Sequence, residues 1–210
     1  IIGPNFFCWN SVIFHKFPNS KNFVSMHQDQ NYWGIIHDKA LSVQLAISES
    51  NVTNGCLRIL PESHKTNYSH HDLVKKDNML ARGQSISDED FEQSKLKNVE
   101  LEPGECVIFH GNIVHGSKPN LSNKHRFCFT MRFLTPDNKI KEDLYYNYAT
   151  LVKGEDNFNF FIKENDLSSS NIKKLKALHK KILVSQIEKY IKLKVKNNTI
   201  TKLVMFFFRF

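Results

Sequence analysis

The stretch "CVIFHGNIVHGSKPNLSNKHRFCFTMRFL", residues 106–134, decides the predicted fold. It contains two runs rich in Val, Ile and Phe, at 106–111 and 126–134, with Gly, Pro, Asn and Ser between them. Such runs are typical of β-strands joined by turns. Both runs are apolar at nearly every position, which is expected where both faces of a strand are covered inside a sandwich or barrel. This pattern favours a jelly roll over an open sheet.

Shorter runs of the same kind surround this stretch, at 11–17, 41–48 and 55–60, and turn-favouring residues separate them. A chain of 210 residues with 40% hydrophobic residues and 17 Phe can bury one sizeable core. We therefore expect a mainly β, cupin-like jelly-roll domain over residues 1–165, followed by a tail over 166–210.

Two segments differ from this strand-and-turn pattern. Residues 62–98 are polar and charged, which predicts a long insertion loop with room for one helical turn, of the kind that often forms a lid or a substrate loop. After "LSSSN", a plausible helix N-cap region, residues 172–193 carry Ile and Leu at helical spacing with lysines between them. We expect these residues to form a basic amphipathic helical appendage on the outside of the sandwich.

The charge distribution argues against a nucleic-acid partner. The formal net charge is +8, but residues 171–210 alone hold eleven Lys and Arg against the single acid Glu188, which leaves the first 170 residues near −2. The apolar end "LVMFFFRF" is far shorter than the ~20 residues that span a bilayer, so no membrane partner is expected. The sequence does not indicate an oligomeric state.

The four cysteines show no C-x-x-C spacing, which disfavours a zinc knuckle or a disulfide framework and favours a reducing, cytoplasmic setting. No signal peptide is visible, and the first residue is not methionine. We expect the chain to be a fragment that lacks N-terminal sequence.

A candidate metal motif lies in "SMHQDQNYWG", residues 25–34, where His27 and Asp29 stand two positions apart. Alone, this pattern also fits a polar turn at a strand end. A third ligand strengthens it, and either His110 or His115 could supply one; we prefer His115 because it lies beyond the strand. Two histidines and one carboxylate form a face of octahedral iron(II) that leaves three positions for a chelating cosubstrate and dioxygen.

Arg126 follows His115 by eleven positions, at the start of the next predicted strand. A 2-oxo dicarboxylic acid that chelates iron at one end needs its distal carboxylate held, and a guanidinium does this with two charge-assisted hydrogen bonds. Ser117 could add a hydroxyl to the same carboxylate. The alternative is that Arg126 is an ordinary surface residue at a strand end.

Five segments in order along the chain carry a family resemblance: "GPNFFCWNSVIFHKFP", "MHQDQNYW", "LSVQLAISESNVTNGCLRILPESH", "LEPGECVIFHGNIVHGSKPNLSNKHRF" and "LVKGEDNFNFF". Over roughly residues 3–160, the chain resembles the phytanoyl-CoA dioxygenase family of iron(II)/2-oxoglutarate-dependent oxygenases. The resemblance implies a double-stranded β-helix in which His27, Asp29 and His115 bind iron(II).

The resemblance also implies roles for four further residues. Arg126 and Ser117 would hold 2-oxoglutarate, Asn10 would stand where the family often has a glutamine that contacts this cosubstrate, and Trp33 would line the pocket. One departure from the family pattern is Glu62, in "LPESH", where the family usually has glycine.

The implied reaction is hydroxylation of an unactivated C–H bond in a small organic substrate, with succinate and carbon dioxide as coproducts and dioxygen as oxidant. Related halogenases have a small residue in place of the carboxylate ligand, so Asp29 favours hydroxylation. A non-catalytic metal-binding jelly-roll protein and a cupin-type metal isomerase, which would not need Arg126, remain alternatives. The substrate stays open among a fatty acyl-CoA, an amino acid derivative and a small secondary metabolite.

Overall fold

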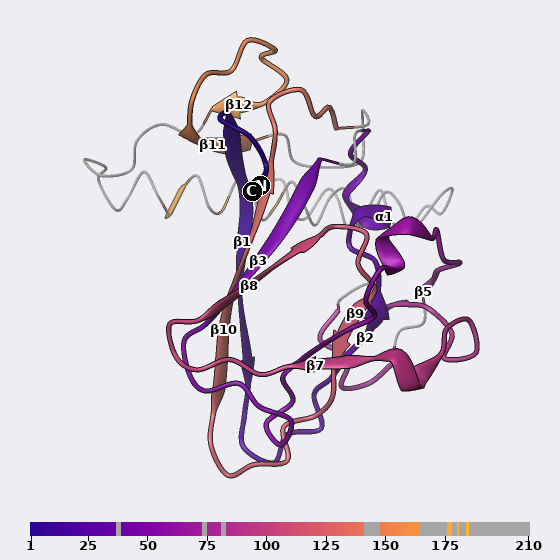
Figure 1. Ribbon diagram of the computed structural model, residues 1–210. Helices are drawn as coiled ribbons and strands as arrows, with labels where there is room; N and C mark the ends of the chain where they lie inside the picture. The colour runs from indigo at the N-terminus through magenta and orange to yellow at the C-terminus, as the bar shows by residue number, and fades with distance from the viewer. Residues whose placement is uncertain are drawn as a thin grey trace, which may run out of the picture.

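A computed structural model describes residues 1–36, 39–72, 75–80, 83–140 and 148–163, together with positions 176, 177, 180 and 184. Two sheets form a β-sandwich (Figure 1). The six-stranded sheet has the order β12 (Ile162–Lys163), β11 (Tyr148–Lys153), β1 (Phe6–Lys16), β10 (Arg126–Leu134), β3 (Ala40–Ala46) and β8 (Cys106–His110). The four-stranded sheet has the order β2 (Val24–His27), β9 (His115–Ser117), β4 (Leu57–Ile59) and β7 (Lys97–Val99). The predicted mainly β jelly roll is confirmed.

Strand β3 alternates strictly between buried and half-buried residues, and β10 does so except at the half-buried Arg132, as a sheet with one covered face requires. The inner face of β10 carries Arg126 and Thr130 as well as apolar residues, while Phe127 and Phe129 point outward. The expectation that both faces of the apolar runs are covered is therefore wrong for the described residues. Polar side chains occupy the inner face because the functional site lies there.

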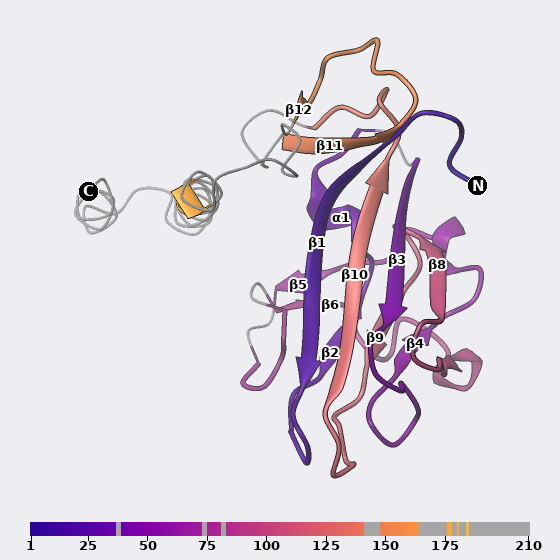
Figure 2. The same ribbon diagram turned by 90° about the vertical axis from the view of Figure 1, so that its left-hand side faces the viewer.

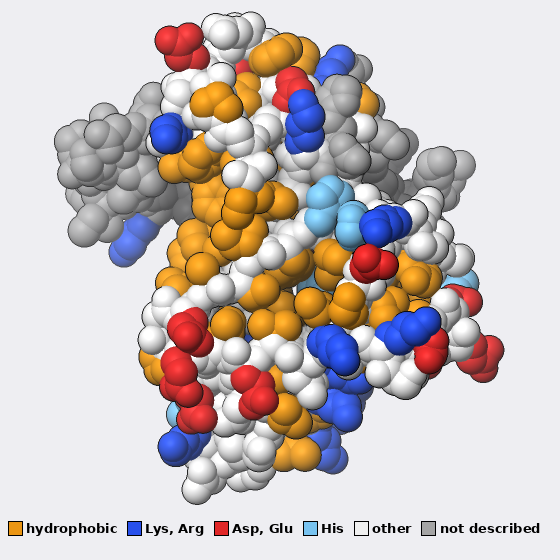
Figure 3. Space-filling view, viewed as in Figure 1, with side chains coloured by type: hydrophobic (Ala, Val, Ile, Leu, Met, Phe, Trp, Pro, Cys, Tyr) orange, Lys and Arg blue, Asp and Glu red, His pale blue; other side chains and the backbone are white. Residues whose placement is uncertain are grey.

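The outer face of the six-stranded sheet is turned toward the viewer in Figure 2, and no described element lies in front of β1, β10 and β3. On this face Ile13 of β1 is 62% exposed and Ile108 of β8 is 44% exposed. Hydrophobic side chains also gather along the left-hand part of the view in Figure 3, over the same strands. The outer face of this sheet is thus more apolar than a solvated sheet face usually is.

A β-bulge interrupts β1, since the register with β10 shifts between Cys8 and Asn10. Before the bulge Phe7 faces inward and is buried, and the bulged residue Trp9 is buried as well. After it Lys16 is buried, so the side chains that face inward change from odd to even positions.

The segment over 62–98 is more structured than a loop. It contains the 3₁₀ turns η1 (Ser63–Lys65) and η2 (Gln93–Lys95), the small hairpin of β5 (His71–Asp72) and β6 (Gln84–Ser85), and β7. Ile86 and Phe91 are buried in a cluster with Met26, Leu60 and Val114. The prediction of a weakly structured loop is wrong here, because these isolated apolar residues anchor the segment to the small sheet.

The predicted helix over 172–193 and the tail over 166–210 fall outside the described residues, apart from four helical positions, and they stay predictions. The domain boundary at residue 165 is likewise untested. Among the described residues, no helix is both long and apolar enough to cross a membrane.

Candidate metal centre and anion site

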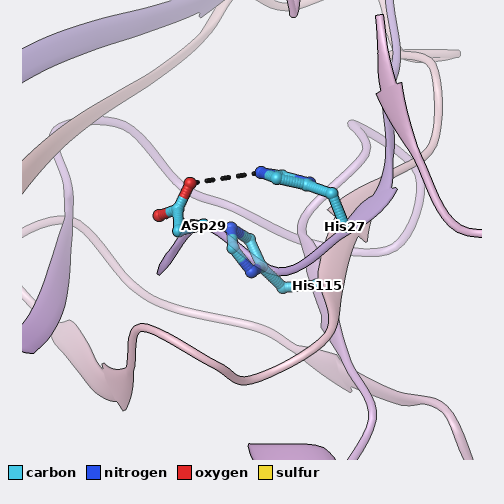
Figure 4. A group of neighbouring side chains, drawn as sticks. All are labelled: His27, Asp29 and His115. Carbon is cyan, nitrogen blue, oxygen red and sulfur yellow. Dashed lines mark hydrogen bonds and ion pairs between the residues drawn. The ribbon is translucent and has the colours of Figure 1, made fainter. Parts of the chain in front are cut away.

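The pairing of β2 with β9 places His27 directly opposite His115. Their ring centroids lie 4.3 Å apart. Asp29 comes two residues after His27, at the start of α1 (Gln30–Trp33), and its carboxylate points toward both rings (Figure 4). Its Oδ1 lies 3.3 Å from Nε2 of His27, and its Oδ2 lies 3.8 Å from Nε2 of His115. All three side chains are buried.

Backbone contacts fix the tautomer of both histidines. Nδ1 of His27 lies 2.9 Å from the carbonyl oxygen of Ser25, and Nδ1 of His115 lies 2.9 Å from that of Ile113. Because a carbonyl oxygen only accepts, each Nδ1 carries the hydrogen and each neutral ring turns an Nε2 lone pair toward Asp29. Lone pairs that face a carboxylate repel it unless a cation lies between them.

The charge states of these groups also fit a metal ion. Burial, and then the neighbouring His27, lower the pKa of His115 to about 4, so that its ring is neutral near pH 7. Burial raises the pKa of Asp29, but the Arg132 guanidinium outweighs this and holds it below its usual range. Two neutral imidazoles and one carboxylate are the donor set that non-haem iron(II) prefers.

Arg132 and Ser42 hold the carboxylate of Asp29 from the side away from the histidines. Nε of Arg132 lies 3.5 Å from Oδ2 of Asp29, and Oγ of Ser42 donates to the same oxygen at 3.2 Å. The guanidinium of Arg132 also lies over the Trp33 ring, 5.4 Å from its centroid, and its Nη1 donates to Oδ1 of Asn10 at 2.9 Å. Such outer contacts orient a metal ligand and tune its affinity.

A cavity between the two sheets adjoins the triad. Its polar lining includes Ser117, Arg126 and Arg132, and its apolar lining comes from Phe14, Val24, Leu57, Leu80 and Phe109. Arg126 is 2% exposed, and its Nε has no hydrogen-bond partner among the described residues. A buried guanidinium with an unused donor at a cavity wall suits an anionic ligand.

The structure thus brings five of the seven sequence-predicted residues to one cavity: His27, Asp29, His115, Ser117 and Arg126. The other two lie outside its lining. Asn10 is exposed and reaches the site through Arg132, while Trp33 belongs to a core cluster with Trp9. His110, the alternative ligand, is on β8 and does not join the triad.

Sequence reasoning missed Arg132 and Ser42. Arg132 is the second arginine of a strand that otherwise reads as apolar, and an arginine inside such a strand was the available signal. Ser42 gave no signal, because a serine on a strand is common.

Comparison with known proteins points to one family. The family model described as phytanoyl-CoA dioxygenase (PhyH) matches residues 2–128. A phytanoyl-CoA dioxygenase domain-containing protein 1 homolog from Caenorhabditis briggsae is 29% identical over 156 residues, which are 68% of this chain and 54% of the relative. The chain therefore spans about half the length of this curated relative.

Two solved structures show the same fold. The non-heme monooxygenase ThoJ, in its apo form, superposes with a TM-score of 0.74 at 24% identity, over 89% of this chain and 67% of ThoJ. EvdO2 from Micromonospora carbonacea var. aurantiaca, complexed with 2-oxoglutarate, superposes with a TM-score of 0.53 at 23% identity, over 67% of this chain and 55% of EvdO2.

Proposed function

Because the chain belongs to the phytanoyl-CoA dioxygenase family, we propose that it is an iron(II)- and 2-oxoglutarate-dependent dioxygenase that hydroxylates an unactivated C–H bond of a small organic substrate. The observation that carries the proposal is the triad of His27, Asp29 and His115, with both Nε2 lone pairs turned toward the carboxylate. Iron(II) bound there would couple oxidative decarboxylation of 2-oxoglutarate, with succinate and carbon dioxide as products, to oxidation of the substrate.

In this proposal the protein supplies binding and orientation. Arg126 and Ser117 hold the distal carboxylate of 2-oxoglutarate, the compound with which the similar protein EvdO2 is complexed. Arg132 and Ser42 keep Asp29 ionised and oriented as a ligand. The apolar lining excludes water from the reacting centre.

The residues that line the cavity also indicate which kind of substrate it can accept. Leu80 belongs to the 62–98 segment, and it lines the cavity together with Phe14 and Val24. We propose that this segment contributes to substrate selection and that the part of the substrate near the iron is apolar. We further propose a reducing, cytoplasmic setting, since the four cysteines are free thiols.

The test is anaerobic titration of the iron(II) protein with 2-oxoglutarate, followed by the charge-transfer band of the chelate, and then succinate release in air. Arg126→Ala should weaken 2-oxoglutarate binding by roughly thirty- to several-thousand-fold, because it leaves a buried carboxylate unpaired. Arg58→Ala, an arginine of β4 outside the cavity lining, is the control.

Each alternative has its own outcome in this test. Iron binding without succinate release would favour a non-catalytic metal-binding protein. Turnover that needs metal but neither 2-oxoglutarate nor Arg126 would favour a cupin-type isomerase. Either result would refute the proposed function.

A further inference from the structure

Lys16 is a fully buried lysine at the end of β1, directly opposite Arg126 in the register of β1 with β10. Its Nζ donates to Oγ of Ser117 at 2.7 Å, to the carbonyl oxygen of Gly55 at 3.3 Å and to the carbonyl oxygen of Lys118. These three acceptors use all three donors of an ammonium group. Lysines are rarely buried unless their donors are satisfied, so these contacts indicate that the interior position of Lys16 is a specific part of the structure.

The cradle around Lys16 depends on a close approach of two backbone segments. Gly55 has a φ of +75°, and a Cβ at this position would lie 2.2 Å from the carbonyl oxygen of Lys118 and 2.7 Å from that of Pro119. Only glycine allows this approach. The carbonyl oxygens of Gly55 and Lys118 thereby converge on the same ammonium.

The charges at this end of the cavity are unbalanced. Lys16 and Arg126 are both buried, and no carboxylate within the described ranges pairs with either of them. Burial and the neighbouring Arg126 guanidinium lower the pKa of Lys16 to about 7. Buried cations without an anion are unfavourable, so this end of the cavity suits a ligand that brings negative charge.

Lys16 itself does not line the cavity, whereas Ser117 and Arg126 do. Because Oγ of Ser117 accepts from Lys16, its own hydrogen cannot point toward the ammonium. The hydroxyl is then free to donate on its other side, where the cavity lies. An anion placed there would receive hydrogen bonds from Ser117 and Arg126 together.

We infer that Lys16 is a positioning residue for the cosubstrate: it fixes the Ser117 hydroxyl as a donor to the distal carboxylate of 2-oxoglutarate, from behind the cavity wall. The inference rests on the proposed function. It predicts that loss of Lys16 weakens the binding of the distal carboxylate and leaves the binding of the 2-oxo acid end, which would chelate iron, unchanged.

The test compares two ligands that differ only at the distal end. 2-Oxopentanoate has the five-carbon 2-oxo acid chain but no distal carboxylate. In Lys16→Met, the affinity of the anaerobic iron(II) protein for 2-oxoglutarate should fall roughly ten- to a hundredfold, the usual effect of losing a hydrogen bond to a charged group. Its affinity for 2-oxopentanoate should stay within about twofold of the wild type. Equal losses for both ligands would indicate general damage and overturn the inference.

A double-mutant cycle tests whether Lys16 acts through Ser117. Ser117→Ala should weaken 2-oxoglutarate binding in the wild-type background and cost little more in Lys16→Met, because the oriented hydroxyl is already lost. Additive losses would contradict the inference. Lys39→Met is the matched control, since Lys39 forms an exposed ion pair with Asp137 and lies outside the cavity lining. If Lys16→Met does not fold, Lys16→Leu, which also removes the donor to Ser117, carries the same comparison.

Failure of the inference can be told apart from failure of the proposed function. If the wild-type iron(II) protein does not bind 2-oxoglutarate, the proposed function fails and the inference falls with it. If the wild type binds it and Lys16→Met binds it equally well, only the inference fails.

Discussion

Asp29 is held on the side away from the histidines by two side chains, through Oγ of Ser42 and Nε of Arg132. Ser42 and Arg132 do not point at the metal position, yet they decide how the carboxylate is turned. Arg132 is in turn held by Asn10 and lies over the ring of Trp33. Asn10 was expected to contact the cosubstrate, and Trp33 was expected to line the pocket. Both instead contact Arg132, which holds Asp29.

Arg132→Met should weaken metal binding roughly ten- to a hundredfold, since outer partners of metal ligands have effects of this size. The lost guanidinium no longer stabilises the ionised carboxylate, so the pKa of Asp29 should rise toward its ordinary value. Titration of the apo protein with iron(II) or manganese(II) measures the effect. Arg132→Lys should recover part of the affinity, because it keeps the charge but not the planar fork. Unchanged affinity in Arg132→Met would show that Arg132 does not support Asp29.

The pKa of Lys16 gives a pH prediction for the metal-free protein. Burial lowers this pKa from 10.5 to about 7 in the folded state, so between these values the unfolded chain binds more protons than the folded one. The contribution of Lys16 to the free energy of unfolding should therefore rise with pH across this window. The charged or titratable groups that act on it are Arg126, Cys56 and Cys128.

Urea unfolding of the wild type and Lys16→Met at several pH values between about 7 and 10 checks this prediction. Arg126 and the two thiols are present in both proteins, so their titration largely cancels in the difference. The difference in unfolding free energy should change with pH in favour of the wild type. A difference independent of pH would mean that Lys16 titrates near its ordinary value.

At the scale of elements, the ligands are positioned by short segments that the rest of the fold holds in place. Gln28, between His27 and Asp29, turns its amide the other way. Its Nε2 donates to the carbonyl oxygens of Thr66 and Asn112 and lies 3.3 Å from that of Ser63. Oγ of Ser63 accepts from the backbone N–H of Val114, next to His115. The η1 turn thus connects the strand that carries His27 to the strand that carries His115.

Glu62, just before η1, has a φ of +63°, a conformation that L residues rarely adopt and that glycine adopts without strain. The family pattern, which usually has glycine here, agrees with this backbone. Glu62→Gly should therefore stabilise the protein by about 0.5–1 kcal/mol, since relief of the left-handed strain exceeds the entropy that glycine adds to the unfolded chain. The exposed ion pair of Glu62 with Lys65 contributes little.

The chain offers a close control for this substitution. Glu92 stands before η2 in the same position and pairs with Lys95 at the same spacing, but its φ is −78°. Glu92→Gly should give no stabilisation. Denaturant midpoints at unchanged slope compare the two variants. Equal effects at both positions would show that the backbone conformation of Glu62 stores no strain.

At the scale of the whole molecule, the two sheets differ in what they bring to the site. The four-stranded sheet supplies His27 and His115, and the six-stranded sheet supplies Arg126, Arg132 and the buried Lys16. The inner face of the larger sheet is polar where it meets the cavity. Metal and cosubstrate would therefore join the two sheets across an interior that has less apolar contact than an ordinary sandwich core.

Metal binding should for this reason stabilise the whole fold. At a free metal concentration of about a hundred times Kd, the gain is ~2.7 kcal/mol, because the unfolded chain has no assembled site. Thermal unfolding with and without manganese(II) measures it. His115→Ala should lose the gain, and His110→Ala, the neighbouring histidine that stays outside the triad, should keep it. Loss of the gain in His110→Ala instead would reverse the assignment of the third ligand.

Much of the site follows from local sequence, and the rest depends on register. The convergence of His27, Asp29 and His115 was predictable because their spacing and their place at strand ends are local features, and the run at 126–134 coincides with β10. The role of Lys16 was not predictable, because a lysine at a strand end is normally exposed. Only the pairing of β1 with β10 places it opposite Arg126. The anchored state of 62–98 was also missed, since two isolated apolar residues look alike whether buried or exposed.

The bulge in β1 inserts one residue into the strand and thereby shifts the alternation of all later side chains by one position. Trp9 is the extra residue between Cys8 and Asn10, so the inward side chains change from odd positions before it, such as Phe7, to even positions after it, such as Lys16. If the side chains of this same sequence alternated without the shift, odd positions would face inward along the whole strand, and His15 would enter the interior while Lys16 turned to solvent. The cation behind Ser117 therefore depends on a bulge that lies far along the strand from it and outside the cavity lining.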